Sequence, residues 1–196
     1  MSKPYNPNDF LAQKARAENY RARSVYKLEE LDQKYYLVKP NMHILDVGAA
    51  PGSWLQYVSE KIGQNGQVVG IDLQEIDPVS PNVQTFVADI TDVAAVQKVL
   101  QTVGWDKVDL LLSDIAPSTS GITDIDHGRS LDLNRAIVAL AKQILKPGKK
   151  LVLKVFEGRD FANFVKELRR DFDHVEVTKS HASRERSKEK YIICFS

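Results

Sequence analysis

The fold of this chain is decided by ILDVGAAPGSW, residues 44–54, where an apolar run ends in a turn of small residues and a helical pattern follows. Gly48 and Gly52 allow the backbone to approach a ligand closely, and Pro51 restricts the turn. The stretch departs from the dinucleotide fingerprint G-x-G-x-x-G, because Ala50 occupies the position of its second glycine. The turn therefore predicts a ligand that has a nucleoside and a compact, less charged tail.

Strand and helix patterns alternate outward from this turn. Apolar runs of strand length occur at 43–47, 67–72, 83–89, 108–114, 150–156, 174–180 and 190–196. Helical spacing occurs at 9–19, 24–34, 53–62, 92–103, 130–145 and 160–171. No helical pattern separates the last two apolar runs. The pattern predicts an α/β fold with a mostly parallel seven-stranded sheet, helices on both faces and an antiparallel C-terminal edge pair.

Length and composition limit the kind of molecule. With 196 residues, 43% hydrophobic and 27% charged, the chain fits one domain, in which residues 1–39 form a basic helical appendage and residues 40–196 the core. No apolar run reaches the roughly 18 residues of a membrane span, and the first residues lack a secretory signal. The single cysteine, Cys194, gives no metal-ligand spacing. We expect a cytoplasmic monomer without membrane contact or metal.

Charge is unevenly distributed along the chain. Residues 1–39 hold 8 basic and 5 acidic side chains, residues 40–141 hold 5 and 13, and residues 142–196 hold 14 and 8. A parallel sheet often brings distant segments together, so the two basic ends could share a face that attracts nucleic acid. Ordinary solvated surface charge would give the same pattern, and charge alone does not decide between the two.

Two aspartates stand where the second and third apolar runs stop. In an open parallel sheet, ligands bind at the carboxyl ends of the strands. Asp72, 20 residues after Gly52, is placed to accept hydrogen bonds from ribose hydroxyls, and Asp89 from an adenine amino group. Either acid alone could be a helix cap or a turn residue. A glycine turn followed by both acids in this order favours an S-adenosylmethionine site.

A lysine interrupts the fifth apolar run in KKLVLKVFEG, residues 149–158. An unpaired charge is costly to bury, so Lys154 needs a partner. The fourth run ends in Asp114, and strands four and five are normally neighbours in this fold, so both side chains should face one cleft. A lysine that snorkels from an edge strand is the alternative, but the apolar residues around Lys154 favour a central strand.

Five separated segments of the chain resemble the FtsJ/RrmJ family of ribosomal RNA 2′-O-methyltransferases in the correct order. The segments are RARSVYKL (21–28), DVGAAPGSW (46–54), DIAP (114–117), LVLKVFEG (151–158) and SRERSKEKY (183–191). The similarity extends from about Tyr20 to the C terminus. Ser53 departs from the family pattern, which has a second glycine there, but a serine is small enough to fit.

The resemblance implies a fold, a cofactor and a set of site residues. The fold is that of a Rossmann-like class I S-adenosylmethionine-dependent methyltransferase, as a single domain over residues 1–196 with its catalytic core at 40–196. The implied catalytic tetrad is Lys27, Asp114, Lys154 and Glu189. Together with the glycine turn, the predicted donor-binding residues are Gly48, Pro51, Gly52, Trp54, Asp72, Asp89 and Asp114.

Methyl transfer to a ribose oxygen needs a group that positions the hydroxyl about 3 to 3.5 Å from the methyl carbon and takes its proton. Lys154 is a base only if its pKa falls well below roughly 10.4. Burial, Lys27 and the cationic donor lower that pKa, whereas Asp114 and Glu189 raise it, so its protonation stays open. Our hypothesis is that Lys154 orients the 2′-oxygen and accepts its proton, Asp114 fixes Lys154, and Lys27 with Glu189 complete the site.

Other methyltransferase chemistries fit the sequence less well. Transfer to carbon 5 of a pyrimidine normally needs a cysteine nucleophile, and Cys194 is in the wrong place. Methylation of exocyclic base nitrogens usually goes with an Asn/Asp-Pro-Pro-aromatic turn, where this chain has Asp114-Ile115-Ala116-Pro117. The 2′-hydroxyl, which distinguishes RNA from DNA, is the acceptor that fits best.

The expected partner is RNA, contacted through the basic segments 21–27, 166–170 and 183–190. The resemblance implies a uridine of large-subunit, 23S-type ribosomal RNA in the assembled subunit as the substrate. A tRNA anticodon-loop 2′-O-methyltransferase is the nearest alternative. A catalytically silent assembly factor that binds the donor or RNA is a further one.

Overall fold

The computed structural model describes residues 10–116, 123–184 and 187–196. Sequence predictions that fall on residues 1–9, on Pro117 and on residues 185–186 lie outside this part of the chain.

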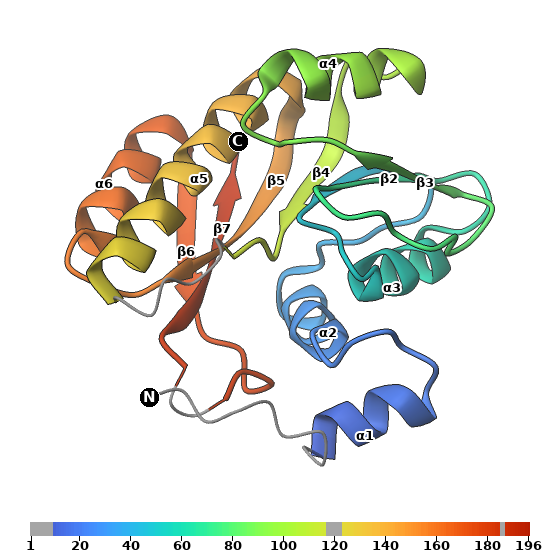
Figure 1. Cartoon of the computed structure of the whole chain (residues 1–196). Helices are drawn as coiled ribbons and strands as arrows, with labels where there is room; N and C mark the ends of the chain where they lie inside the picture. The colour runs from blue at the N-terminus through green and yellow to red at the C-terminus, as the bar shows by residue number, and fades with distance from the viewer. Residues whose placement is uncertain (1–9, 117–122, 185–186) are drawn as a thin grey trace.

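Seven strands form one sheet in the order β3-β2-β1-β4-β5-β7-β6 (Figure 1). They are β1 His43–Val47, β2 Gln67–Asp72, β3 Val83–Val87, β4 Val108–Ser113, β5 Leu145–Phe156, β6 His174–Thr178 and β7 Glu189–Phe195. Strands β1 to β5 pair in parallel, and β7 pairs antiparallel with both β5 and β6. The mostly parallel sheet with an antiparallel C-terminal edge pair is thereby confirmed.

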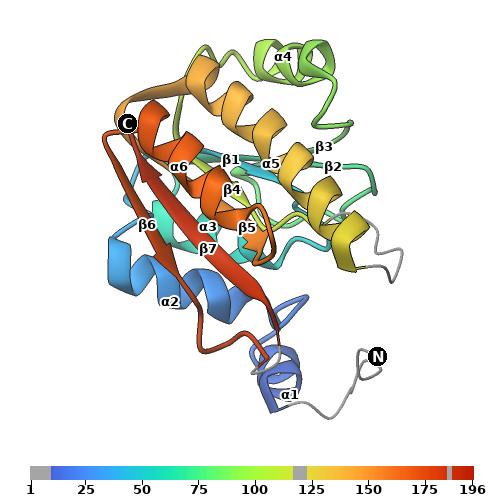
Figure 2. The ribbon, with the colours of Figure 1, turned by 90° about the vertical axis from the view of Figure 1, so that its left-hand side faces the viewer.

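Helices cover both faces of the sheet (Figure 2). They are α1 Phe10–Ala17, α2 Val25–Tyr35, α3 Ser53–Ile62, α4 Val93–Thr102, α5 Thr123–Ile144 and α6 Phe161–Asp171. One apolar core gathers side chains of α2 and α3, and the other gathers side chains of α4, α5 and α6. None of the described helices is long and apolar enough to cross a membrane.

Side-chain alternation along β5 divides its residues between the two cores. Leu151, Leu153 and Val155 are buried in the core beneath α5 and α6, whereas Val152 is buried in the core beneath α2 and α3. Successive side chains of a strand point to opposite faces. Lys154 therefore falls on the α2–α3 face, near the carboxyl end of its strand.

Two element boundaries differ from the sequence prediction by more than two residues. Helix α5 begins at Thr123 rather than at residue 130. Strand β5 begins at Leu145 rather than at residue 150, because Leu145 pairs with Val108 before the register shifts. Gly148, with φ of 72°, lies within the irregular segment that separates this first contact from the regular ladder.

Candidate active site

The four predicted tetrad residues come from four elements. Lys27 lies in α2, Asp114 follows β4, Lys154 lies in β5, and Glu189 begins β7. The structure brings them together as two ion pairs. Neighbouring parallel strands β4 and β5 place one pair at their carboxyl ends, and α2 packed on that face supplies the other lysine.

Lys154 pairs with Asp114. The Lys154 side chain is 7% exposed, and its Nζ lies 3.3 Å from Asp114 Oδ1. The same Nζ also donates a hydrogen bond to the main-chain carbonyl of Asp114. This double contact explains how a lysine is accommodated inside an apolar strand, since a buried ammonium requires both a counter-charge and hydrogen-bond acceptors.

Lys27 pairs with Glu189. The Lys27 Nζ donates to both carboxylate oxygens of Glu189, at 3.0 and 3.1 Å. Burial alone would raise the pKa of Glu189, but the charges of Lys27 and Lys154, together with hydrogen bonds from Lys27 and Ser187, outweigh it and hold that pKa below its usual value. Because Lys154 acts on Glu189 as well, the two ion pairs are electrostatic neighbours.

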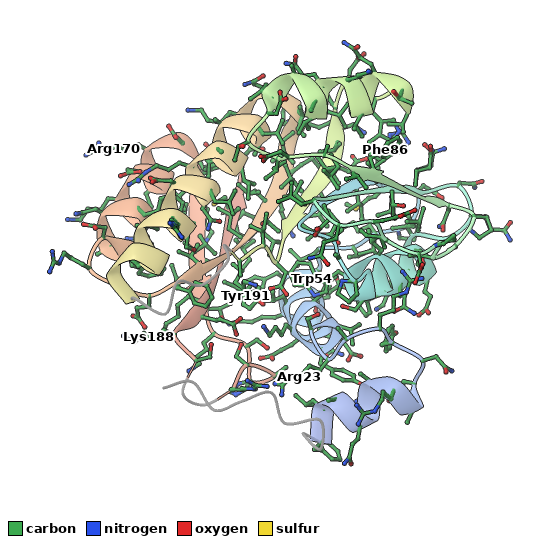
Figure 3. All side chains as sticks on the ribbon, in the orientation of Figure 1. Arg23, Trp54, Phe86, Arg170, Lys188 and Tyr191 are labelled. Atoms are coloured by element: carbon green, nitrogen blue, oxygen red, sulfur yellow. The ribbon has the colours of Figure 1, made fainter. Side chains whose placement is uncertain are left out.

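Tyr191 joins the two pairs, a role that its sequence context did not indicate. Its hydroxyl donates to Asp114 Oδ1 at 2.7 Å, and its ring centroid lies 5.9 Å from Lys27 Nζ. The residue is fully buried, and its ring lies 6.2 Å from that of Trp54 (Figure 3). The sequence does contain a signal for its position. Residues two apart on a strand share a face, and Tyr191 follows the predicted site residue Glu189 by two.

Burial, followed by the charges of Asp114 and Glu189, raises the pKa of Tyr191. The phenol therefore keeps its proton and remains a hydrogen-bond donor to Asp114. A carboxylate that receives both Lys154 and the Tyr191 hydroxyl has little freedom to rotate, which fixes the direction of the Lys154 amine.

The glycine turn shapes the other side of the site. Gly48 has φ of 73°, and a Cβ there would stand 2.7 Å from the Cβ of Ile115. Only glycine meets both requirements without strain. The Ala50 N–H donates to Asp72 Oδ2 at 2.9 Å, so Asp72 also holds the turn. Trp54 Nε1 donates to the carbonyl of Ser24 at 2.9 Å, which ties the turn to the start of α2.

A pocket of about 550 Å³ opens at the carboxyl ends of the parallel strands. We call it the donor pocket, because it lies where the sequence predicts that the methyl donor binds. Four of the predicted donor-binding residues line it: Gly48, Asp72, Asp89 and Asp114. Trp54 lines a narrow cavity of about 10 Å³ beside it. Pro51 lines a separate neighbouring cavity, and Gly52 is not among the residues that line the donor pocket or the two smaller cavities beside it.

Asp89 also has a local role in this structure. Its Oδ1 accepts hydrogen bonds from the Thr91 backbone N–H at 2.8 Å and the Thr91 hydroxyl at 2.7 Å. These bonds lower the pKa of Asp89. Asp89 therefore acts as a turn residue, which was one of the alternatives that the sequence left open. The same residue also lines the donor pocket.

Asp46 is a second residue that sequence reasoning missed. Its side chain is 1% exposed, and neither carboxyl oxygen has a hydrogen-bond partner among the described residues. Burial, then Asp114 and Asp72, raise its pKa well above the usual value. The sequence signal that could have identified Asp46 is its place inside the apolar run HILDV. An acidic residue is as unusual in such a run as the lysine in β5.

Three cavities follow one another through the site. The donor pocket shares Gly48, Ala50 and Asp114 with the narrow cavity of about 10 Å³, which we call the neck. The neck shares Ser24 with a third cavity of about 320 Å³, which we call the basic pocket. The basic pocket is lined by Arg23, Ser24, Lys27, Arg184, Ser187 and Glu189.

This arrangement can position a polar ligand group and exchange a proton with it. Asp114, which pairs with Lys154, lines both the donor pocket and the neck, and the Lys27–Glu189 pair forms a wall of the basic pocket. No group of three or more His, Cys, Asp or Glu that could hold a metal ion occurs within residues 10–116, 123–184 and 187–196.

The basic segments predicted to contact RNA are distributed over both faces. Residues 166–170 belong to α6, on the opposite side of the sheet from α2, and Figure 3 shows Arg170 far from Arg23. Arg21 instead braces the glycine turn, because its Nη1 donates to the carbonyls of Pro51 at 3.1 Å and Asp77 at 2.8 Å.

Comparison with known proteins gives a consistent result. A family model described as FtsJ-like methyltransferase matches residues 20–196. A protein named ribosomal RNA large subunit methyltransferase E from Legionella pneumophila (strain Corby) is 41% identical over 186 residues, 95% of this chain and 90% of that protein. One of the same name from Syntrophobacter fumaroxidans is 42% identical over 190 residues, 96% of this chain and 95% of that protein.

A solved structure is also similar. It is the crystal structure of a ribosomal RNA methyltransferase from Plasmodium falciparum, with a TM-score of 0.78 and 32% sequence identity. The match covers 90% of this chain and 97% of that one.

Proposed function

The chain belongs to the FtsJ-like methyltransferase family, and on that premise we propose that it methylates a ribose 2′-hydroxyl in RNA. The substrate that we propose is a uridine of large-subunit, 23S-type ribosomal RNA in the assembled subunit, in line with the names of its relatives. Such a substrate would be met in the cytoplasm. The catalytic core is assigned to residues 40–196 and the basic appendage to residues 1–39.

The observation that carries this proposal is that Asp114, the ion-pair partner of Lys154, stands where two cavities meet. Asp114 lines both the donor pocket and the neck. On the other side, Ser24 links the neck to the basic pocket. A transferase that joins two ligands needs separate sites for them that meet at the reacting atoms.

The donor pocket fits S-adenosylmethionine, the methyl donor that the family generally uses. When bound, this cofactor supplies an electrophilic methyl group on a positively charged sulfur. Asp46, Asp72 and Asp114 give this region an excess of carboxyl groups, and the oxygens of Asp46 lack any other partner among the described residues. Such an orphaned carboxyl suits a cationic ligand.

We assign the remaining donor contacts by position. Asp72 would accept from ribose hydroxyls and Asp89 from the adenine amino group, next to the apolar Leu73 and Ile90 of the pocket. Gly48, Pro51 and Gly52 would let the backbone of the turn approach the donor, and Trp54 would hold the turn against α2.

The tetrad residues have different roles in this proposal. Lys154 orients the 2′-oxygen and accepts its proton, which requires the amine to be neutral when the hydroxyl arrives. Asp114 fixes the amine through its carboxylate and main-chain carbonyl. Lys27 and Glu189 complete the polar wall on the acceptor side.

The test is transfer of labelled methyl from S-adenosylmethionine to large ribosomal subunits, free ribosomal RNA and tRNA that lack the modification. We expect label in the large subunit, in a dinucleotide that resists alkaline hydrolysis, because a methylated 2′-oxygen cannot attack its 3′-phosphate. Label found only in tRNA would replace this substrate with an anticodon loop. No label in any RNA would leave the role of a silent assembly factor.

A further inference from the structure

The end of β5, which carries Lys154, extends beyond its neighbour β4. The last pair of the β4–β5 ladder is Ser113 with Leu153, whereas β5 continues to Phe156. The main-chain groups that a longer β4 would have bonded are thus without a strand partner on this edge. Such groups need other hydrogen-bond partners where they are buried.

Two carbonyls face this edge. The Glu157 N–H donates to the Lys188 carbonyl at 2.8 Å, on the side of β7. Successive residues of a strand direct their N–H and C=O groups to alternate edges. The carbonyls of Lys154 and Phe156 therefore both face the opposite edge, beyond the end of β4.

Side chains of α5 bond both carbonyls in place of a strand. Asn134 Nδ2 donates to the Lys154 carbonyl at 3.1 Å, and His127 Nδ1 lies 3.1 Å from the Phe156 carbonyl. The two side chains stand about two helical turns apart and so share one face of α5. Helix α5 thereby completes the hydrogen bonding of the strand end.

His127 also holds the residues that follow β5. Its Nε2 accepts the Asp160 N–H at 3.2 Å. Because a carbonyl only accepts, Nδ1 carries the ring proton and donates it to Phe156, while Nε2 keeps its lone pair. One neutral imidazole thus joins Phe156 to Asp160 and closes the turn between β5 and α6.

Gly158 leaves room for this imidazole. A Cβ at residue 158 would stand 2.7 Å from both Cγ and Nδ1 of His127. A side chain at this position would therefore displace the ring. The turn is held from its other side as well, because Lys190 of β7 pairs with Glu157 at 3.5 Å.

We propose that His127 is a positioning residue for methyl transfer, which fixes the end of β5 where β4 is absent and so holds Lys154 and Glu189 in place. The inference rests on the proposed function and deepens it. Phe156, which His127 bonds, lies two residues beyond Lys154 and is the register partner of Glu189. Both tetrad residues are thus linked to the imidazole through the main chain.

His127 acts from the far side of the sheet. It belongs to α5, whereas the Lys154 side chain lies on the α2–α3 face. His127 is not among the residues that line the donor pocket, the neck or the basic pocket. Its effect on the reaction should therefore appear in the rate of the chemical step and not in ligand affinity.

The early end of β4 and the α5 contacts serve one arrangement. Because β4 ends at Ser113, Asp114 is free to turn toward the Lys154 amine, which it contacts through its carboxylate and its carbonyl. The same early end leaves one edge of β5 without a strand. His127 and Asn134 cover that edge without blocking the approach of Asp114.

The test compares His127→Leu with His174→Leu, the same exchange at an exposed position of β6. The measurement is the single-turnover rate of methyl transfer to large ribosomal subunits at saturating S-adenosylmethionine. We expect His127→Leu to slow this rate about 10- to 100-fold, since a misplacement of about 1 Å can cost that much. The affinity for S-adenosylmethionine, measured by calorimetry, should stay unchanged. His174→Leu should react as the wild type does.

Two further variants separate positioning from general damage to the fold. His127→Gln keeps a donor and an acceptor on one side chain, so its rate should fall between those of the wild type and His127→Leu. In a Lys154→Ala background, His127→Leu should slow the residual reaction much less than it does in the wild type, because its effect runs through Lys154. General damage would slow both backgrounds alike.

Hydrogen exchange tests the contact without the reaction. The amide of Asp160, followed by NMR, should exchange faster in His127→Leu and in Gly158→Ala than in His174→Leu, because its acceptor is removed or displaced. An unchanged exchange rate would refute the contact itself.

The positioning role is wrong if folded His127→Leu reacts at the wild-type rate, or if it slows the Lys154→Ala enzyme as strongly as the wild type. Its failure can be told apart from that of the proposed function. If the wild type methylates no RNA, the proposed function fails, while exchange at Asp160 still decides whether His127 holds the turn.

Discussion

The Nζ of Lys154 contacts both the carboxylate and the main-chain carbonyl of Asp114, with 3.3 Å to the carboxylate Oδ1. A single residue thus fixes the amine from two directions. These two contacts restrict the rotation of the Lys154 amine. Asp114 directly follows β4, so the backbone at the end of β4 sets the direction in which the amine can make a further hydrogen bond. This relationship makes Lys154 the residue whose removal should matter most.

Lys154→Ala should reduce methyl transfer by about 10²- to 10⁴-fold, the usual contribution of a positioned acid or base. Donor affinity, measured by calorimetry, should change little, because the donor pocket is lined by other residues. Lys98→Ala, at an exposed position of α4, is the matched control and should leave both values unchanged. Full activity in Lys154→Ala would refute its assignment as the base.

Asn134→Leu should lower kcat because it loosens the strand end that carries Lys154. Asn134 is fully buried in α5, and its Nδ2 donates to the Lys154 carbonyl at 3.1 Å and the Ser130 carbonyl at 2.8 Å. Loss of this donor removes a hydrogen bond to the Lys154 carbonyl and should cost about 0.5 to 1.5 kcal/mol of unfolding free energy.

The KM values for donor and RNA should stay near those of the wild type, since Asn134 lines no described pocket. Steady-state kinetics and urea unfolding measure both effects. Asn163→Leu is the matched control, because it makes the same substitution at an exposed position of α6. It should leave kcat unchanged. An unchanged kcat in a folded Asn134→Leu protein would show that the hydrogen bond from Asn134 does not help to position Lys154.

The order of the fold could be predicted from the sequence because each strand is a distinct apolar run and each helix has its own spacing. The start of α5 could not. Residues 123–130 are mostly polar and lack an apolar stripe, yet the helix forms there. His127 is buried, its Nδ1 lies 3.1 Å from the Phe156 carbonyl, and its Nε2 accepts the Asp160 N–H at 3.2 Å. Tertiary contacts of this kind override local propensity.

The site was predictable to the extent that its residues follow strand ends or recognisable segments. The Lys154–Asp114 contact was expected, because strands four and five were predicted to be neighbours. The hydrogen bonds between Lys27 and Glu189 could not be read from the residues alone, because the two are 162 positions apart and only the folded sheet brings them together. Tyr191 and Asp46 were missed for a related reason. Each stands inside an apolar strand, where a tyrosine is an ordinary core residue and an aspartate gains meaning only from its three-dimensional neighbours.

Gly48→Ala should destabilise the protein more than Gly104→Ala does. Both glycines have φ of 73°, but a Cβ at residue 104 meets nothing within 4 Å, whereas one at residue 48 would stand 2.7 Å from the Cβ of Ile115. The left-handed conformation alone costs an alanine about 1 to 2 kcal/mol.

Urea unfolding should give roughly that loss for Gly104→Ala and a larger one for Gly48→Ala, together with weaker donor binding. Adding Ile115→Gly to Gly48→Ala removes the Cβ and Cγ1 of residue 115, the two closest of the clashing atoms, and should recover part of the difference. Equal losses in the two single variants would mean that the Ile115 contact does not restrict residue 48.

Asp46→Asn should stabilise the protein without ligand at alkaline pH while weakening the donor site. The folded-state pKa of Asp46 is raised, by burial first and then by Asp114 and Asp72. The unfolded chain loses this proton near the ordinary aspartate pKa of about 3.9, and the folded chain keeps it to higher pH. Between these two pKa values the folded state binds more protons, so stability is complete below the lower one and is lost as pH rises through the upper one.

The amide introduced by Asp46→Asn would resemble the protonated carboxyl at every pH and so escape this loss. The melting temperature of Asp46→Asn minus that of the wild type should therefore be larger at pH 8 than at pH 4, measured without donor. At pH 8 donor affinity should fall, since the ionised carboxyl that would face a cationic ligand is gone. A difference in melting temperature that does not change with pH would mean that Asp46 titrates alike in the folded and unfolded chain. Higher stability combined with weaker donor binding is the pattern expected of a residue retained for its ligand at a cost to the fold.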